Sequence, residues 1–173
     1  AVEKVARDVD LGYVVWENSE AISEGLQEEN YIDQTEISSD GTRMIYATGG
    51  TEGNSNLFLR RWDGNNWGDP RPMRALNSNF NETSPSLSGN GDLLLFASDR
   101  PGGQGGNDIW ISKWDGAEYA WPLPLTSRVN TPFDETDPSI TPDGLTVFFT
   151  SNRPHQAADI SVKEAAKDAE AEQ

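Results

Sequence analysis

A repeat of about fifty residues constrains this chain more than any other feature. The segments SSDGTRMIYAT (38–48), SGNGDLLLFAS (88–98) and TPDGLTVFFTS (141–151) begin 50 and then 53 residues apart. In each of them, polar residues and an Asp-Gly or Asn-Gly pair precede a short apolar run. A period of roughly 20–50 residues is typical of folds that stack one structural unit repeatedly.

Further matches follow in the same order along the chain. NLFLRRWDGNNW (56–67) matches DIWISKWDGAEYAW (108–121), and NSNFNE (77–82) matches NTPFDE (130–135). Short apolar runs separated by Gly, Asp and Asn indicate β-strands joined by tight turns. The repeated unit is therefore predicted to consist of strands.

Each unit is predicted to hold four antiparallel strands. In the second unit they are expected at Pro85–Leu87, Leu93–Ala97, Asp108–Trp114 and, less regularly, around Trp121. Asn90-Gly91 and Asp115-Gly116 supply the residues of positive φ that hairpin turns need. Four antiparallel strands in a repeat of about 40–50 residues make a β-propeller blade. The predicted fold class is therefore all-β, a β-propeller made of four-stranded antiparallel blades.

The glycine-rich stretch SDRPGGQGGNDIW (98–110) invites comparison with a phosphate-binding loop. It lacks the GxxxxGK spacing and has no lysine to reach a phosphate. A strand rather than a helix is expected after it, so no helix N-terminus would face a phosphate. We interpret it as the loop between the second and third strands of a blade.

The repeat resembles the TolB-like (WD-repeat-like) propeller repeat of bacterial envelope proteins. The matching residues are ETSPS (82–86) and ETDPS (135–139), DG (143–144), FASDRP (96–101) and FTSNRP (149–154), and GGNDIW (105–110). The resemblance covers roughly residues 32–160. It implies a periplasmic or extracellular propeller that binds proteins or joins a cell-wall-linked assembly, or one that accompanies the catalytic domain of a peptidase.

The chain holds only about two and a half to three blades, whereas closed propellers need about four to eight. The expected division is an acidic segment 1–31 with the last strand of a preceding blade at 12–16, blade 1 at 32–82, blade 2 at 83–135, a partial blade 3 at 136–162 with a strand at 159–162, and a helix-prone polar tail at 163–173. We therefore expect a partial propeller that a protein partner or further copies complete, because open blades expose strand edges.

Polar residues that recur between blades are predicted to meet on one rim of the propeller. The candidate binding rim consists of Asp99, Arg100, Glu82, Asn130, Glu135, Asn152 and Arg153, with Asn77 beside them. The alternative interpretation is structural, with Glu82 and Glu135 holding adjacent blades through hydrogen bonds or ion pairs. Recurrence in each blade favours the structural alternative, since a single ligand site does not need the same residues in every blade.

Catalytic chemistry finds little support in the sequence. His155 is the only histidine, and there is no GxSxG motif to pair with it. We predict no cofactor. Ca²⁺ is an alternative at WDGNNWGD (62–69), which offers carboxylates but lacks the spacing of a calcium loop. The tryptophans, among them Trp110, Trp114 and Trp121, are expected to pack between blades or, at the outermost positions, to form a platform for sugars.

Charge narrows the classes of partner. The chain has 13 Lys and Arg against 29 Asp and Glu, a formal charge of −16, which disfavours nucleic acid and anionic lipid. It has no cysteine and no apolar window of about 18 residues, the length of a membrane span. A start at Ala1 fits a mature secreted chain or an excised piece.

We therefore expect a non-enzymatic protein-binding or scaffolding propeller segment of a bacterial envelope protein. The alternatives are an accessory propeller of a hydrolase or peptidase and a carbohydrate-binding propeller.

Overall fold

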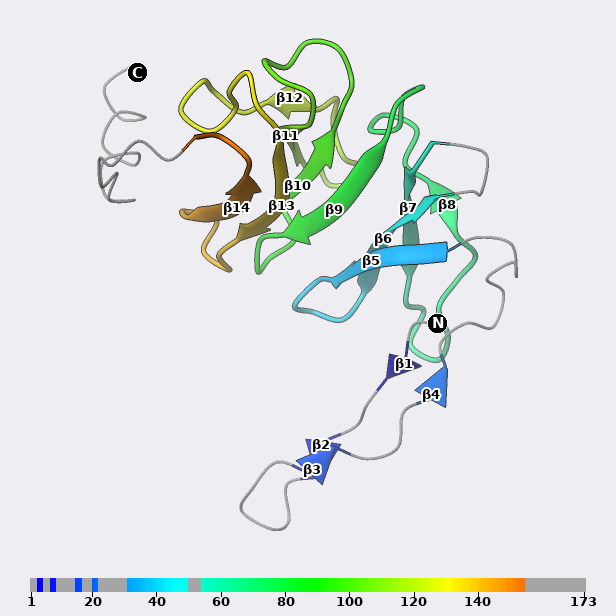
Figure 1. Ribbon diagram of the computed structural model, residues 1–173. Coiled ribbons are helices and arrows are strands. Elements are labelled where there is room, and N and C mark those ends of the chain that lie inside the picture. The colour runs from blue at the N-terminus through cyan, green and yellow to red at the C-terminus, as the bar shows by residue number, and fades with distance from the viewer. Residues whose placement is uncertain are drawn as a thin grey trace.

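Three antiparallel sheets lie face to face and form the body of the molecule (Figure 1). The structure is a computed structural model that describes residues 31–49 and 54–154, with four two-residue strands nearer the N-terminus. The short strands are β1 (Glu3–Lys4), β2 (Arg7–Asp8), β3 (Val15–Trp16) and β4 (Glu20–Ala21). β1 pairs with β4, and β2 pairs with β3. The described residues contain no helix.

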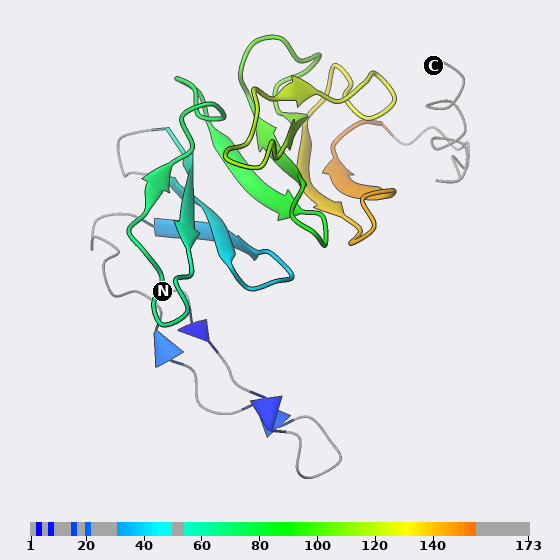
Figure 2. The same cartoon turned by 180° about the vertical axis from the view of Figure 1, so that it is seen from behind.

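Two sheets have four strands each, paired in the order of the sequence. We call them blade 1, with β5 (Tyr31–Ile37), β6 (Arg43–Gly49), β7 (Asn56–Arg61) and β8 (Arg71–Pro72), and blade 2, with β9 (Glu82–Leu87), β10 (Leu93–Ser98), β11 (Asp108–Lys113) and β12 (Leu123–Pro124). Blade 3 has β13 (Glu135–Ile140) and β14 (Val147–Ser151). Figure 2 shows the same succession of blades from behind. The predicted fold class, partial propeller blades in an all-β chain, is confirmed.

The turn between the first two strands of each blade is built by an Asp or Asn side chain. Asp40, Asn90 and Asp143 each accept the backbone N–H two residues further on, at 2.9, 3.1 and 3.0 Å. The glycine after each has φ of 69°, 68° or 74°, a left-handed conformation that glycine adopts without strain. Hydrogen bonds from Ser38 and Thr42 lower the pKa of Asp40 to about 2.

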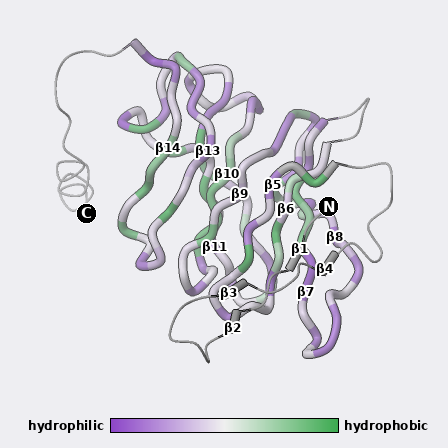
Figure 3. The backbone as a smooth tube through the Cα atoms, turned by 60° about the horizontal axis from the view of Figure 1, so that its bottom comes forward, coloured by the Kyte–Doolittle hydropathy of each residue, from purple (hydrophilic) through white to green (hydrophobic). Residues whose placement is uncertain are grey.

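The hydrophobic core lies in two layers between the blades, because alternate residues of a strand face opposite sides of a sheet. On β10, Leu94 and Phe96 pack in the layer with blade 1, whereas Leu95 and Ala97 pack in the layer with blade 3. All four are 0% exposed. Figure 3 shows the apolar segments lying along the strands and the polar ones in the loops.

The first strands of the blades are linked directly to one another. The N–H of Leu87 donates to Glu36 Oε1 at 3.3 Å, and the N–H of Ile140 donates to Ser86 Oγ at 3.2 Å. Glu36 and Ser86 are equivalent repeat positions, as are Leu87 and Ile140. The blades therefore pack with the same offset at both interfaces.

The tryptophan expectations hold only in part. Trp110 is buried in the core and Trp114 packs against it, but Trp62 and Trp67 pack on each other at 5.4 Å between ring centroids. The bridge Trp62–Trp67 has its counterpart in Trp114–Tyr119, not in a pair with Trp121. The fourth strand is Leu123–Pro124, and Trp121 stands before it with 76% of its surface exposed. The repeat had aligned Trp67 with Trp121, whereas its structural counterpart is Tyr119. The sequence alone did not separate these two because both are aromatic.

Several expectations fall on residues outside the described part of the chain. They are the strand at 159–162, the helix-prone tail 163–173, the residue His155 and most of the predicted strand 12–16. Of that last strand, Val15–Trp16 is described, and it pairs with Arg7–Asp8. Among the described residues there is no helix long and apolar enough to span a bilayer.

Candidate functional site

Glu82 and Arg100 of the predicted rim form a buried ion pair. Arg100 Nη2 lies 2.8 Å from Glu82 Oε1, with side-chain exposures of 10% and 0%. The carboxylate also accepts the N–H and hydroxyl of Ser78 at 3.1 and 2.6 Å. Arg100 donates further to Ser98 Oγ at 3.1 Å and to the carbonyl of Leu76, in the linker that follows blade 1. Its guanidinium therefore ties the start of blade 2 to the preceding linker.

The same arrangement recurs in blade 3. Arg153 Nη2 lies 2.9 Å from the fully buried Glu135, whose carboxylate also accepts from Thr131 and Ser151. Arg153 donates to the carbonyl of Val129, in the linker that follows blade 2. Its side chain is 31% exposed, so this second pair is more open to solvent than the first.

The remaining rim residues also bond within the chain. Asn130 is 0% exposed, and it accepts the N–H of Ile109 at 2.9 Å and donates to that residue's carbonyl at 3.0 Å. Asn77 makes the same two bonds to Leu57 in blade 1. Each asparagine thus continues the hydrogen-bond ladder of a third strand.

Asp99 and Asn152 close the same loop in their two blades. Asp99 accepts the N–H and the amide of Asn81, at 2.7 and 3.0 Å. In blade 3 the acid and the amide have exchanged places, and Asn152 accepts from and donates to Asp134 at 2.9 and 2.8 Å.

The structure therefore brings the candidate rim residues together through contacts within the chain. The side chains of Glu82, Asn130 and Glu135 have no exposed surface for a partner to touch. A binding role stays a prediction for the members that keep exposed surface, Asn152 above all.

A polar cluster that sequence reasoning missed joins the first strands of all three blades. Gln34, Ser84 and Asp137 are equivalent repeat positions, and the Ser84 hydroxyl donates to Asp137 Oδ1 at 2.9 Å. Gln34 donates to the same oxygen at 3.3 Å and accepts the N–H of Ser84. Ser84 and Asp137 have φ of 51° and 49°, which only a few per cent of non-glycine residues adopt. The differing residue types hid their equivalence in the sequence.

The outer face of blade 3 carries large apolar side chains that the described residues leave exposed. Phe148 on β14 is 57% exposed and Leu145, in the turn before it, is 79% exposed. In the repeat, Phe148 corresponds to Ile45 of blade 1 and Leu95 of blade 2. Both of these are 0% exposed, each packed in the layer with the following blade. Phe148 therefore occupies a position that is an interface in the other two blades.

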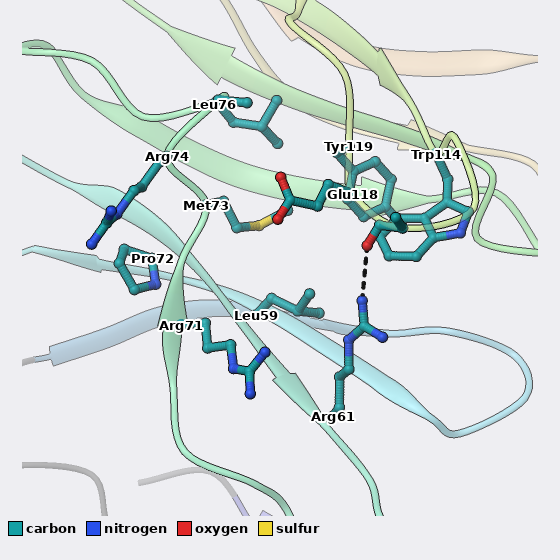
Figure 4. Close-up of a pocket in the computed structure, with 12 residues that line it drawn as sticks. Leu59, Arg61, Arg71, Pro72, Met73, Arg74, Leu76, Trp114, Glu118 and Tyr119 are labelled. Carbon is teal, nitrogen blue, oxygen red and sulfur yellow. Dashed lines mark hydrogen bonds between the residues drawn. The ribbon is translucent and has the colours of Figure 1, made fainter.

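A pocket of about 480 Å³ opens between the outer strands of blade 1 and the turn at residues 114–119 of blade 2. Its apolar lining includes Leu59, Met73 and Leu76 from blade 1 and Trp114 and Tyr119 from blade 2. Figure 4 shows the aromatic rings facing the blade 1 side chains across the pocket. Glu118, Arg61, Arg71 and Arg74 add charge to this lining.

Tyr119 anchors the blade 2 side of the pocket. Its hydroxyl donates to the carbonyl of Gly91 at 2.7 Å and accepts from Arg43 at 3.4 Å. Burial raises the pKa of Tyr119 to about 12, and the Arg43 cation offsets only part of that rise. The phenol is therefore held in its neutral form.

This pKa gives a first prediction. A group whose pKa is raised on folding contributes stability below its unfolded value, near 10 for tyrosine, and loses it as the pH rises through the folded value. We expect the stability difference between the native chain and Tyr119→Phe to be constant below about pH 10 and to shrink toward pH 12. Absorbance titration at alkaline pH checks the assignment, because the highest-pKa tyrosine should vanish in Tyr119→Phe. Ionisation of Tyr119 near pH 10 would contradict it.

The glycine-rich loop is a turn between β10 and β11, as predicted. The backbone N–H groups of Gln104 and Gly105 donate to Asp108 Oδ2 at 2.9 and 3.1 Å, so the loop folds around a carboxylate of its own chain. A Cβ on Gly105 would overlap the carbonyl oxygens of Thr131 and Phe133. At the alternative Ca²⁺ segment, Asp63 Oδ1 accepts two turn N–H groups. No cluster of three potential metal ligands occurs among the described residues.

Comparisons with known proteins find similarity among solved structures only. No protein-family model matches the chain, and no curated protein matches its sequence. Among solved structures, it is similar to the crystal structure of TolB from Acinetobacter baumannii, with 16% sequence identity and a TM-score of 0.49. The match covers 87% of this chain and 32% of that one, so the chain spans about a third of that protein's length. The assignment to propeller blades rests on the three stacked sheets of the chain itself.

Proposed function

We propose that this chain is a non-catalytic scaffolding segment of a propeller in the bacterial cell envelope, and that the outer face of blade 3 binds a protein. The observation that carries the proposal is the exposure of Phe148 at a repeat position that is fully buried in both other blades. An apolar patch on a sheet face marks an interaction surface.

The occupant that fits this face is a β-sheet with the shape of a further blade. Both interfaces in the structure join one blade to the next with apolar side chains from the second strand, here Ile45 and Leu95. Phe148 holds the equivalent repeat position on the second strand of blade 3. Blade 1 is not the natural counterpart, because Met44 and Tyr46 on its other face are each only 2% exposed.

The envelope location and the absence of catalysis rest on other grounds. The location is supported by the resemblance of the repeat to TolB-like propeller repeats. The non-catalytic role is supported by the use of the recurring polar residues, such as Glu82 and Arg100, in bonds within the chain.

Self-association tests the proposal, since two copies can cover their exposed apolar side chains by pairing the outer faces of their third blades. We expect light scattering coupled to size exclusion to show association that rises with concentration and that Phe148→Glu suppresses. Trp121→Glu is the matched control, because Trp121 is a large exposed apolar residue outside this face. A native chain that stays monomeric at every concentration, or equal suppression by both variants, would argue against a binding face at blade 3.

A further inference from the structure

The pocket between blades 1 and 2 carries positive charge in a chain of formal charge −16. Three arginines, Arg61, Arg71 and Arg74, line it against one acid, Glu118. Arg61 is held in place, since it donates to the carbonyl of Ala117 at 3.0 Å and its guanidinium carbon lies 5.2 Å from the Trp114 ring centroid. Arg71 and Arg74 are exposed, and their guanidinium groups make no hydrogen bond or ion pair with other described residues.

These two arginines are not required by the blade architecture. Arg71 pairs with Leu59 on the third strand of blade 1, and the same place in blade 2, opposite Ile111, holds Leu123. Arg74 lies three residues before Asn77, and three residues before the equivalent Asn130 the chain has Ser127. By contrast, Arg100 and Arg153 recur and are bonded.

We propose that this pocket binds a small ligand that joins an oxyanion, carboxylate or phosphate, to an apolar body. Guanidinium groups bind both oxyanions through paired hydrogen bonds. Figure 4 shows the guanidinium groups of Arg71 and Arg61 on the same side of the pocket, with that of Arg74 pointing away from it. Arg71 therefore binds the oxyanion beside Arg61. Arg74 contributes mainly through the electrostatic attraction of its positive charge for the anion.

The apolar body has a matching surface. Leu59 and Trp114 are partly exposed where they line the pocket, and Met73 and Tyr119 add smaller exposed areas of 8% and 4%. A volume of about 480 Å³ falls within the usual range for small-molecule sites. This pocket is distinct from the outer face of blade 3, so a ligand can bind here whether or not a protein binds there.

The test uses the whole chain, with phenyl phosphate and phenylacetate as anionic probes and 2-phenylethanol as the neutral one. We expect the two anions to shift the backbone amide signals of Leu76, Glu118 and Tyr119 in NMR titrations, and the neutral probe to leave them unchanged. The tighter of the two anions identifies phosphate or carboxylate as the preferred oxyanion. Binding should weaken with added salt.

Three variants locate the anion. Arg71→Leu introduces the residue type that blade 2 has at the equivalent position, Leu123. We expect it to weaken binding about tenfold or more. Arg74→Ser should weaken binding by a smaller factor, and Lys113→Gln, an exposed cation outside the pocket, should leave it unchanged. The spectrum without probe confirms that each variant is folded. The proposal is overturned if neither anion shifts these signals, if Arg71→Leu binds as the native chain does, or if inorganic phosphate binds as tightly as phenyl phosphate.

Discussion

Arg100→Met should lower the free energy of unfolding by roughly 3–5 kcal/mol, the range for removing one partner of a buried ion pair. Methionine retains an apolar stem against Phe96 and Trp110, whose ring centroids lie 5.0 and 5.1 Å from the guanidinium carbon. The loss therefore reflects the Glu82 carboxylate left without its cation together with the guanidinium hydrogen bonds to Ser98 and Leu76. Urea unfolding, with the midpoint and slope fitted together, provides the measurement.

Two further variants separate the unpaired charge from the lost hydrogen bonds. Arg153→Met should cost less than Arg100→Met, because Arg153 is 31% exposed and water can reach the gap it leaves. Adding Glu82→Gln to Arg100→Met should recover part of the loss, since the amide removes the unpaired charge and still accepts the N–H of Ser78. Equal losses for the two arginines, or no recovery in the double variant, would contradict a buried charge as the cause.

Leu95→Ala should lower the free energy of unfolding by about 2–5 kcal/mol, whereas Phe148→Ala should lower it by less than about 1 kcal/mol. Leu95 is 0% exposed in the layer between blades 2 and 3, so its truncation leaves a cavity. Phe148 holds the equivalent repeat position, but 57% of its surface faces solvent. The comparison therefore isolates the effect of a covering blade.

The measurement is equilibrium unfolding at low protein concentration, where self-association does not contribute. A large loss for Phe148→Ala would show that its ring is buried in solution. That result would remove the observation on which the proposed binding face rests.

Most of the fold could be predicted from the repeat, but less of the candidate sites could. Asp-Gly turns and apolar runs repeat at nearly fixed spacing. They predict turns and strands directly, because both depend on local backbone chemistry. The fourth strand was harder to place, because β12 has only the two residues Leu123 and Pro124 and few side chains to mark it. Spacing also suggested that Glu82 and Arg100 share a rim, but burial, which separates a structural pair from a binding pair, depends on the neighbouring blade.

The cluster of Gln34, Ser84 and Asp137 and the arginine-lined pocket escaped prediction for a different reason. The cluster members are chemically unlike one another, and their equivalence is visible only once the three first strands are aligned in space. Arg71 and Arg74 belong to no motif, and they gain meaning from the apolar side chains that blade 2 brings across from them. Sites formed between repeats are not encoded within any one repeat.

The arginines of the two Glu–Arg pairs bond in the same direction along the chain, toward the preceding blade. Arg100 bonds to the carbonyl of Leu76, and Arg153 to that of Val129, so blades 2 and 3 are each fastened to the linker before them. The first unit has Gly50 where the second has Arg100. These bonds point back toward the N-terminus, and none of them involves Phe148 on the outer face of blade 3. A protein bound at that face would therefore leave these bonds intact.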